Sequence, residues 1–171
     1  MKECEEWLEV SRKIFPKLRR RKIGVRYTKM TRKKLGCVTA KIPREFDFDP
    51  EALLLGKETP IRKKTTMPDY YQISINQDIQ KIQNPALRKQ VVRHILIHEL
   101  LHVEYGDLVA HTKSYSQRKR KKFHVADFEQ EVFNRFNQIR ELENLPTIQK
   151  KEHMNAAIQK ILASLDWRKK A

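Results

Sequence analysis

The spacing of hydrophobic residues along the chain predicts a mixture of helices and strands. Up to Arg20, apolar residues recur at helical intervals that Pro16 interrupts, so one or two short helices are expected there. Apolar and polar residues then alternate with the period of half-buried strands at Ile23 to Tyr27, Cys37 to Ile42 and Tyr70 to Asn76. We expect the first two strands to form a hairpin and the proline-rich segment 43–68 to form a loop.

Longer helices are predicted in the second half of the chain. Asn84 and Pro85 favour a helix start, because asparagine caps free amides and proline suits the first helical position. The segment that follows, to about Tyr105, is apolar over most of its circumference, which is typical of a helix at the centre of a domain. Further apolar stripes run over 128–142 and 154–165, the last predicting either a packed helix or a separable basic arm. The pattern therefore indicates an α+β fold, with a small sheet packed on a central helix.

Length and composition limit the class of protein. A chain of 171 residues is about one domain long, and we expect a main domain over 1–145 and a basic helical extension over 146–171. No apolar run is long enough to cross a bilayer, and the first ten residues are acidic and amphipathic, unlike a signal peptide. Cys4 and Cys37 form no Cys-x-x-Cys pair and are expected to be free thiols. We therefore expect no membrane partner and a cytoplasmic protein, free or associated with the nucleoid.

The charge of the chain favours a polyanionic partner. Lys and Arg number 37 against 21 Asp and Glu, which gives a formal net charge of +16. A charge of this size attracts nucleic acid. The alternative interpretation is a lysine-rich surface that serves only solubility.

The strongest chemical signal is the motif His98-Glu99-Leu100-Leu101-His102. Residues four apart lie on one face of a helix, so both imidazoles can reach one zinc ion. Glu99 is then the candidate general base, which takes a proton from a zinc-activated water and passes it to the leaving amine. Because the helix is otherwise apolar, these polar groups are costly to bury unless a metal or partner satisfies them. His94, one turn earlier, is expected behind the ligands or at the surface.

A catalytic zinc needs a third protein ligand and one position open to water. His124 is the first candidate, because in the arrangement His124-x-x-x-Phe128 the packing of the next helix would aim its imidazole at the metal. His111 is the rival. Glu129 and Glu131 remain alternatives, unless they are ordinary solvent-facing charges.

Four motifs follow one another in the sequence: V-R-Y-T-K-M-T-R-K-K-L-G-C at Val25 to Cys37, Y-Q-I-S-I-N at Tyr71 to Asn76, the H-E-L-L-H motif, and His124-x-x-x-Phe128. Their order resembles the SprT-like zinc metalloproteases, the family that includes Spartan, over about residues 10 to 142. The resemblance implies a compact zincin-like domain with His98 and His102 as zinc ligands, Glu99 as base and a third histidine before an aromatic residue. For Spartan-type members it further implies DNA-dependent proteolysis of proteins crosslinked to DNA.

Two features depart from the family pattern. The interval from His102 to His124 is longer than the family would have and contains Q-R-K-R-K-K at Gln117 to Lys122, which leaves the third ligand open between His124 and His111. No cysteine follows Cys37, so the sequence lacks the cysteine zinc ribbon of many members. DNA binding must therefore depend on other residues.

Basic clusters are the candidates for DNA binding. Each phosphate that Lys or Arg neutralises releases counterions, so several contacts give strong, salt-sensitive and sequence-independent binding. Tyr115 and Trp167 lie beside two clusters in sequence and are candidates to stack on unpaired bases, which favours single-stranded or damaged DNA. The alternative for each cluster is a solvated positive face. The main candidate residues are Arg118, Lys119, Arg120, Lys121 and Lys122, and the other clusters are Arg19 to Lys22, Arg32 to Lys34, Arg62 to Lys64 and Arg168 to Lys170.

The protein substrate is expected to pair with an edge strand beside the metal, and we assign Tyr71, Ile73 and Ile75 to that strand. The leading prediction is thus a zinc endopeptidase that hydrolyses DNA-bound or DNA-crosslinked proteins. One alternative is a small zincin peptidase without DNA coupling, YgjP-like or minigluzincin-like. The other is a basic nucleic-acid-binding module with a closed structural zinc site, made by all four of His98, His102, His111 and His124.

Overall fold

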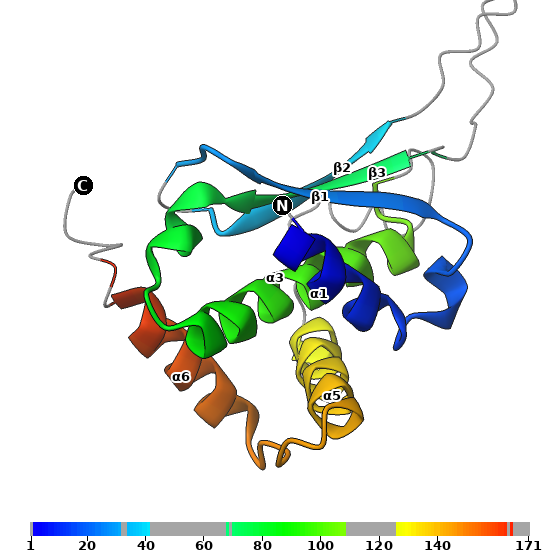
Figure 1. Ribbon diagram of the computed structural model, residues 1–171. Coiled ribbons are helices and arrows are strands. Elements are labelled where there is room, and N and C mark those ends of the chain that lie inside the picture. Colours follow the sequence, from blue (N-terminus) through cyan, green and yellow to red (C-terminus); the bar gives the residue numbers. More distant parts are fainter. Residues whose placement is uncertain are drawn as a thin grey trace, which may run out of the picture.

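The computed structural model describes residues 2–31, 34–41, 68, 70–108, 126–163 and 165. In this part of the chain the fold is α+β, as the hydrophobic pattern predicts, with a three-stranded sheet above the helices (Figure 1). The helices α1, α3, α5 and α6 lie on the same side of the sheet. The elements, including two short 3-10 helices, are α1 (Lys2–Arg12), η1 (Pro16–Leu18), β1 (Lys22–Thr28), β2 (Gly36–Lys41), β3 (Tyr70–Asn76), η2 (Gln77–Lys81), α3 (Pro85–Tyr105), α5 (Ala126–Leu142) and α6 (Lys151–Ala163).

The order of the strands shows that the predicted hairpin is wrong. The sheet has the order β1-β3-β2, with β3 parallel to β1 and antiparallel to β2. β3 is the central strand, and its apolar residues Ile73 and Ile75 are both 0 % exposed. The connection from β1 to β2 therefore passes the end of β3, where the Asn76 side chain donates to the carbonyls of Thr31 at 3.3 Å and Lys34 at 2.9 Å.

The same order corrects the assignment of the substrate strand. Tyr71, Ile73 and Ile75 lie in a strand that is hydrogen-bonded on both sides, so its backbone has no edge to offer a peptide. The alternation of polar residues in this strand results from a polar outer face of the sheet, not from an exposed edge. Among the described strands, β1 and β2 form the edges.

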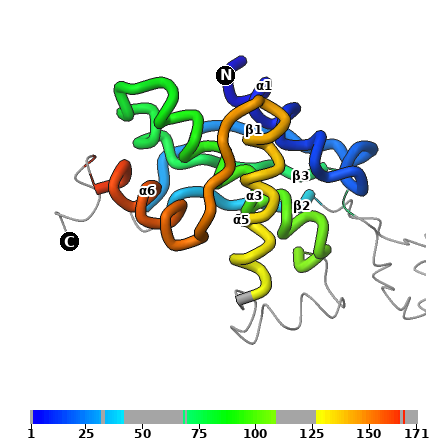
Figure 2. The backbone as a smooth tube through the Cα atoms, turned by 90° about the horizontal axis from the view of Figure 1, so that it is seen from below, coloured from blue at the N-terminus to red at the C-terminus, as the bar shows by residue number. Residues whose placement is uncertain are grey.

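The helix α3 is the centre of the fold, as its apolar circumference predicts. The Asn84 side chain caps its first turn by accepting from the backbone amides of Ala86 at 2.9 Å and Leu87 at 3.2 Å, and Pro85 occupies the first position. One side of α3 faces the sheet and the opposite side faces α5 and α6, which lie below it in Figure 1 and nearest the viewer in Figure 2. No helix in the described ranges is both long and apolar enough to span a membrane.

The last helix, α6, packs against the core. Met154, Ile158 and Leu162 are all buried, and the segment before α6 is held by reciprocal 2.9 Å hydrogen bonds between the Asn137 side chain and the backbone of Ile148. Of the two predicted alternatives, the packed helix is therefore confirmed over Lys151–Ala163. The domain boundary at 145/146 stays a prediction, and Trp167 lies outside the described residues.

Candidate metal centre

The two histidines of the central motif face each other on the C-terminal half of α3. His102 is 5 % exposed and His98 is half-buried, and their Nε2 atoms are 3.3 Å apart with the ring planes at 74°. Two nitrogens that bind one tetrahedral zinc at about 2.0–2.1 Å lie about 3.3 Å apart. The separation and the atoms involved therefore fit a shared zinc ion, which is what the sequence motif predicts.

Asp107 fixes the orientation of His102. Its Oδ2 lies 2.7 Å from His102 Nδ1, and the aspartate is 0 % exposed. Gly106 ends α3 in the left-handed region, at φ 66°, and this turn brings the next residue back against the helix. When Nδ1 donates its proton to the carboxylate, the lone pair of the ring is on Nε2, the atom that faces His98. The sequence pattern assigned no role to Asp107, and the available signal was an acid directly after the glycine that ends the helix.

Glu99 lies between the two histidines in sequence. Its side chain is 6 % exposed and lies near Gly36 of the sheet. A Cβ added to Gly36, the first residue of β2, would lie 3.5 Å from Glu99 Oε1 and only 2.4 Å from Ile95 Cγ2. Only glycine therefore lets β2 approach α3 at this point. The carboxylate of the candidate base is placed beside the start of an edge strand.

The first turns of α5 cover the histidines. The ring of Phe128 lies 5.1 Å from the His98 ring and 5.0 Å from the His102 ring, between centroids, and 5.9 Å from the ring of Tyr105. Phe128 is 2 % exposed, so it closes this side of the pair to water. The aromatic residue of the His124-x-x-x-Phe128 motif is thus in contact distance of both predicted ligands.

His94 is half-buried one turn before the pair, and its ring meets that of Phe136 edge-to-face at 6.3 Å. Its Nδ1 is buried and has no hydrogen-bond partner in the part of the chain that the structure describes. Burial lowers the pKa of His94 to about 4, so the ring is neutral at physiological pH.

Beside the two histidines, the described residues place no third candidate ligand. Within them, no group of three or more His, Cys, Asp or Glu side chains is placed to hold a metal, so neither Glu129 nor Glu131 completes the site with the two histidines. The Glu131 carboxylate instead accepts from Arg135 Nε at 2.7 Å. His124 and His111 both lie outside the described residues.

An ion pair that the sequence analysis missed holds the other half of α3. Arg93, 4 % exposed inside an apparently apolar helix, donates through both terminal nitrogens to the Glu143 carboxylate, which also pairs with Lys89 Nζ at 3.2 Å. The hydrogen bonds from Arg93 are the main cause that lowers the pKa of Glu143. The sequence did contain a signal for this pair. Arg93 recurs at the helical spacing of the buried residues of α3, and an acid, Glu143, follows the next helix.

The predicted nucleic-acid residues are mostly outside the described ranges. Arg118, Lys119, Arg120, Lys121 and Lys122 belong to this group, as do Tyr115, Arg62 to Lys64 and Arg168 to Lys170. In the cluster that is described, Arg19, Arg20 and Lys22 are exposed and Arg21 is half-buried.

Comparison of the chain with protein-family models, with curated proteins and with solved structures gives no match. The interpretation of the site therefore depends on its own geometry and on the motifs in the sequence.

Proposed function

We propose that the protein is a zinc-dependent endopeptidase of the SprT-like type. The observation that carries this proposal is the 3.3 Å separation of the Nε2 atoms of His98 and His102, with Asp107 on the far nitrogen of His102. Imidazole nitrogens are ligands that zinc prefers, and a carboxylate behind a ligand strengthens metal binding. His124 is proposed as the third ligand, because Phe128, four residues later, lies against both rings.

The residues around the pair divide the work of peptide hydrolysis. When bound, zinc supplies a Lewis acid that lowers the pKa of a coordinated water to about 7. Glu99 takes a proton from the attacking water on its carboxylate and delivers it to the nitrogen of the scissile bond. Asp107 holds the tautomer of His102, and Phe128 excludes solvent from one side of the pair.

The substrate backbone is proposed to pair with β2 rather than with β3. In the described part of the chain β2 is hydrogen-bonded to β3 alone, and its first residue lies beside Glu99. An added strand is bound through backbone amides, so side-chain selection is weak. Peptides N-methylated at a single amide near the cleavage site should be cleaved more than about tenfold more slowly, whereas single side-chain changes should matter less. The reverse ranking would contradict this binding mode.

The net charge of +16 supports an association of this peptidase with DNA, and proteins bound or crosslinked to DNA are the proposed substrates. Single-stranded DNA should then stimulate cleavage of a DNA-bound protein. If DNA changes neither the rate nor the thermal stability, the alternative zincin peptidase without DNA coupling is the better description.

The direct test combines metal content with activity. Purified protein should contain about one zinc per chain, and Glu99→Gln should keep the zinc while losing at least about 100-fold in rate, the contribution of a general base. His102→Ala should lose the zinc. His153→Ala is the matched control, because His153 is exposed on α6, and it should keep both. Equal cleavage by the wild type and Glu99→Gln would reject the mechanism.

The third ligand is tested by the zinc content of His124→Ala beside His111→Ala. Loss of zinc in His124→Ala alone supports the proposed open site. If both variants lose zinc, four histidines close the site, and the protein is a nucleic-acid-binding module with a structural zinc instead.

A further inference from the structure

The sheet has two faces of opposite character, which the register defines. Side chains of successive residues point to opposite faces. The face toward the helices carries the rows Ile23–Tyr71–Ala40 and Val25–Ile73–Val38, all apolar or aromatic. The other face, here called the outer face, carries the rows Lys22–Tyr70–Lys41, Gly24–Gln72–Thr39 and Arg26–Ser74–Cys37.

The outer face carries exposed cations and is in part open to solvent, and at its β1 edge Gly24 and Tyr70 line a pocket with the acidic residues Glu5, Glu6 and Glu9 of α1. Lys22, Arg26, Thr39 and Lys41 are exposed, and none of the three strands contains an Asp or Glu. The helices lie on the opposite side of the sheet (Figure 1). At the Asn76 end the face is covered by the β1–β2 connection. Among the residues that the structure describes, the open end is therefore the one around Tyr70.

Tyr70 lies between two lysines across the strands at this open end. It is opposite Lys22 of β1 and Lys41 of β2, and Lys41 Nζ is 5.5 Å from the centre of its ring. Its hydroxyl donates to Gln72 Oε1 at 2.8 Å, which fixes the ring along the strand. The half-buried ring of Tyr70 thus has the Lys41 cation near it, and Lys22 is its neighbour across the strands on the other side.

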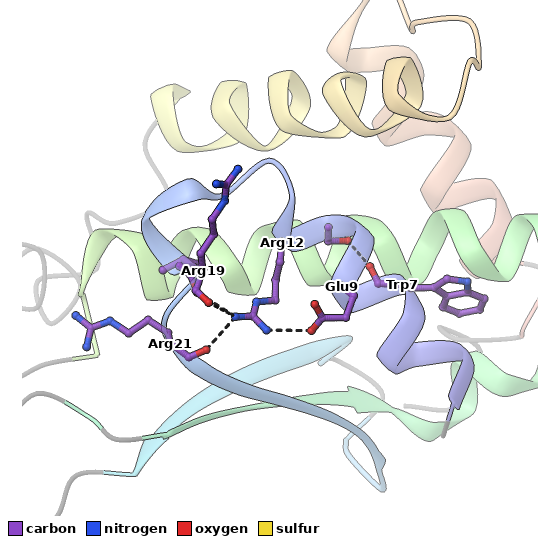
Figure 3. A network of polar contacts seen from close by, with 7 residues as sticks. Trp7, Glu9, Arg12, Arg19 and Arg21 are labelled. Atoms are coloured by element: carbon purple, nitrogen blue, oxygen red, sulfur yellow. Dashed lines mark hydrogen bonds and ion pairs between the residues drawn. The ribbon is translucent and has the colours of Figure 1, made fainter.

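The basic turn before β1 leads into Lys22, the first residue of that strand. Arg12 holds the turn by donating to the carbonyls of Leu18 at 3.2 Å, Arg19 at 2.9 Å and Arg21 at 3.0 Å, and it also pairs with Glu9. Figure 3 shows the side chains of Arg19 and Arg21 pointing away from this guanidinium, that of Arg19 toward the helix side of the sheet. The carbonyls of the turn are thus occupied by Arg12, and of its cations only Lys22 belongs to the outer face.

We propose that the outer face, with its exposed cations Lys22, Arg26 and Lys41, binds single-stranded nucleic acid. The exposed arginines and lysines match a phosphate backbone, and a base can stack on Tyr70 between the two lysines that hold flanking phosphates. Gln72 and Thr39 offer amide and hydroxyl groups to base edges or sugars. The proposal rests on the DNA association proposed above and gives it a binding surface, and it does not depend on the metal centre.

A bilayer surface fits these observations less well. The exposed large hydrophobic residues of the described chain are Leu87, Tyr105, Leu142 and Leu145, and none lies on the outer face or in the turn. The face therefore has charges for anionic lipid but no apolar side chain to insert. A duplex would meet the cations but leave Tyr70 without a function.

The first test separates a specific surface from general positive charge. We compare Lys22→Gln/Arg26→Gln/Lys41→Gln with the matched control Lys150→Gln/Lys151→Gln/Lys160→Gln, which removes the same charge from α6 and the residue before it. Both carry Glu99→Gln to prevent self-cleavage, and binding of an oligo-dT strand is followed by fluorescence anisotropy. The outer-face variant should weaken binding more than about tenfold and flatten the salt dependence by about two powers, at about 0.7 per lost phosphate contact. Equal losses in the two variants would overturn the proposal.

The second test addresses the stacking residue. Tyr70→Leu should weaken binding of the single strand by about fivefold or more, while Tyr70→Phe, which keeps the ring, should bind as the starting protein does. Thermal unfolding of each variant shows whether the fold is retained. Tighter binding to a duplex or to anionic vesicles than to the single strand, with no effect of Tyr70→Leu, would show that single-stranded nucleic acid is not the ligand of this face. This assay measures neither zinc nor cleavage, so its failure is separate from failure of the peptidase.

Discussion

The two halves of α3 satisfy their buried polar groups in different ways. In the N-terminal half, Arg93 is paired with Glu143 from the end of α5, which in turn pairs with Lys89. In the C-terminal half, His98 and His102 direct the same ring atom at each other from 3.3 Å, and Asp107 lies behind one of them. The first half is balanced by charges of the chain itself, whereas the second holds two imidazoles whose separation fits the proposed zinc ion.

This difference shows why the same apolar helix can be both scaffold and site. The ion pair ties α3 to α5 and keeps the helix in place, and the capped start at Asn84 adds to its rigidity. A rigid helix can then hold two ligands at one turn's distance with the precision that a metal needs. Variants in the N-terminal half of α3 should therefore change the stability of the fold, whereas variants in the C-terminal half should change metal binding.

The largest effect on stability is expected at the ion pair. Glu143→Leu leaves the Arg93 guanidinium buried, with its side chain 5 % exposed, and should lower the free energy of unfolding by about 3–5 kcal/mol. Arg93→Leu should cost less, because Glu143 is 22 % exposed and keeps Lys89. Urea unfolding measures both, and Lys81→Ala, which breaks an exposed pair with Asp78, is the control with an expected change below about 0.5 kcal/mol. If Arg93→Leu is the more damaging, the pair is not what holds this half.

The next largest effect is the stabilisation of the fold by zinc, which is expected to bind at the C-terminal half of α3. Free zinc at about 100 times its dissociation constant should add about 2.7 kcal/mol to the free energy of unfolding, or about 5–10 °C in Tm for a chain of this size. The shift should disappear in His102→Ala and persist in Arg93→Leu, measured at a temperature where both are folded. A zinc shift that survives in His102→Ala would place the metal elsewhere.

A smaller effect is expected from Asp107→Asn. The amide oxygen can still accept a hydrogen bond from His102 Nδ1, but it carries no negative charge. Zinc affinity should therefore fall about 10–100-fold, which is about 1.4–2.7 kcal/mol. Competition with a chelator measures the affinity, and the spectrum of bound Co2+ reports whether the coordination geometry is kept. The exposed Asp127→Asn is the matched control and should bind as the wild type does. Unchanged affinity in Asp107→Asn would show that the carboxylate serves only to end the helix.

The local elements could be predicted from the sequence because each depends on neighbours in the chain. Asn84 and Pro85 start α3 where the pattern indicates, and Gly106 ends it. The motif histidines come together because residues four apart on a helix must share a face. The division at Pro16 and the stripe of α5 follow from the same local rules.

The errors concern long-range relations. β1 and β2 each carry the alternation of a half-buried strand, but alternation does not specify the partner strand, so the hairpin was predicted where β3 inserts. The contact of Asp107 with His102 requires the left-handed turn at Gly106, and the pairing of Arg93 with Glu143 joins two helices 50 positions apart in the chain. Such contacts follow from packing, which periodicity alone does not encode.

The smallest predicted effect lies at His94, on the boundary between the two halves. Its pKa of about 4 in the folded protein is below the ordinary value of 6.5, so the unfolded chain binds the proton more readily. The stabilisation is complete above pH 6.5 and is lost as the pH falls toward 4. Between pH 7 and 5.5 the metal-free wild type should lose about 1 kcal/mol more than His94→Leu.

Urea unfolding in the presence of a chelator measures this difference, with His153→Leu, exposed on α6, as the matched control that should follow the wild type. The same pH dependence in His94→Leu and the wild type would show that the ring is not kept neutral by the packing of Phe136. A smaller pH dependence of stability in His94→Leu than in the wild type would show that the packing of α5 keeps the His94 ring uncharged, one turn from the histidine pair. The boundary between scaffold and site would then lie between His94 and His98.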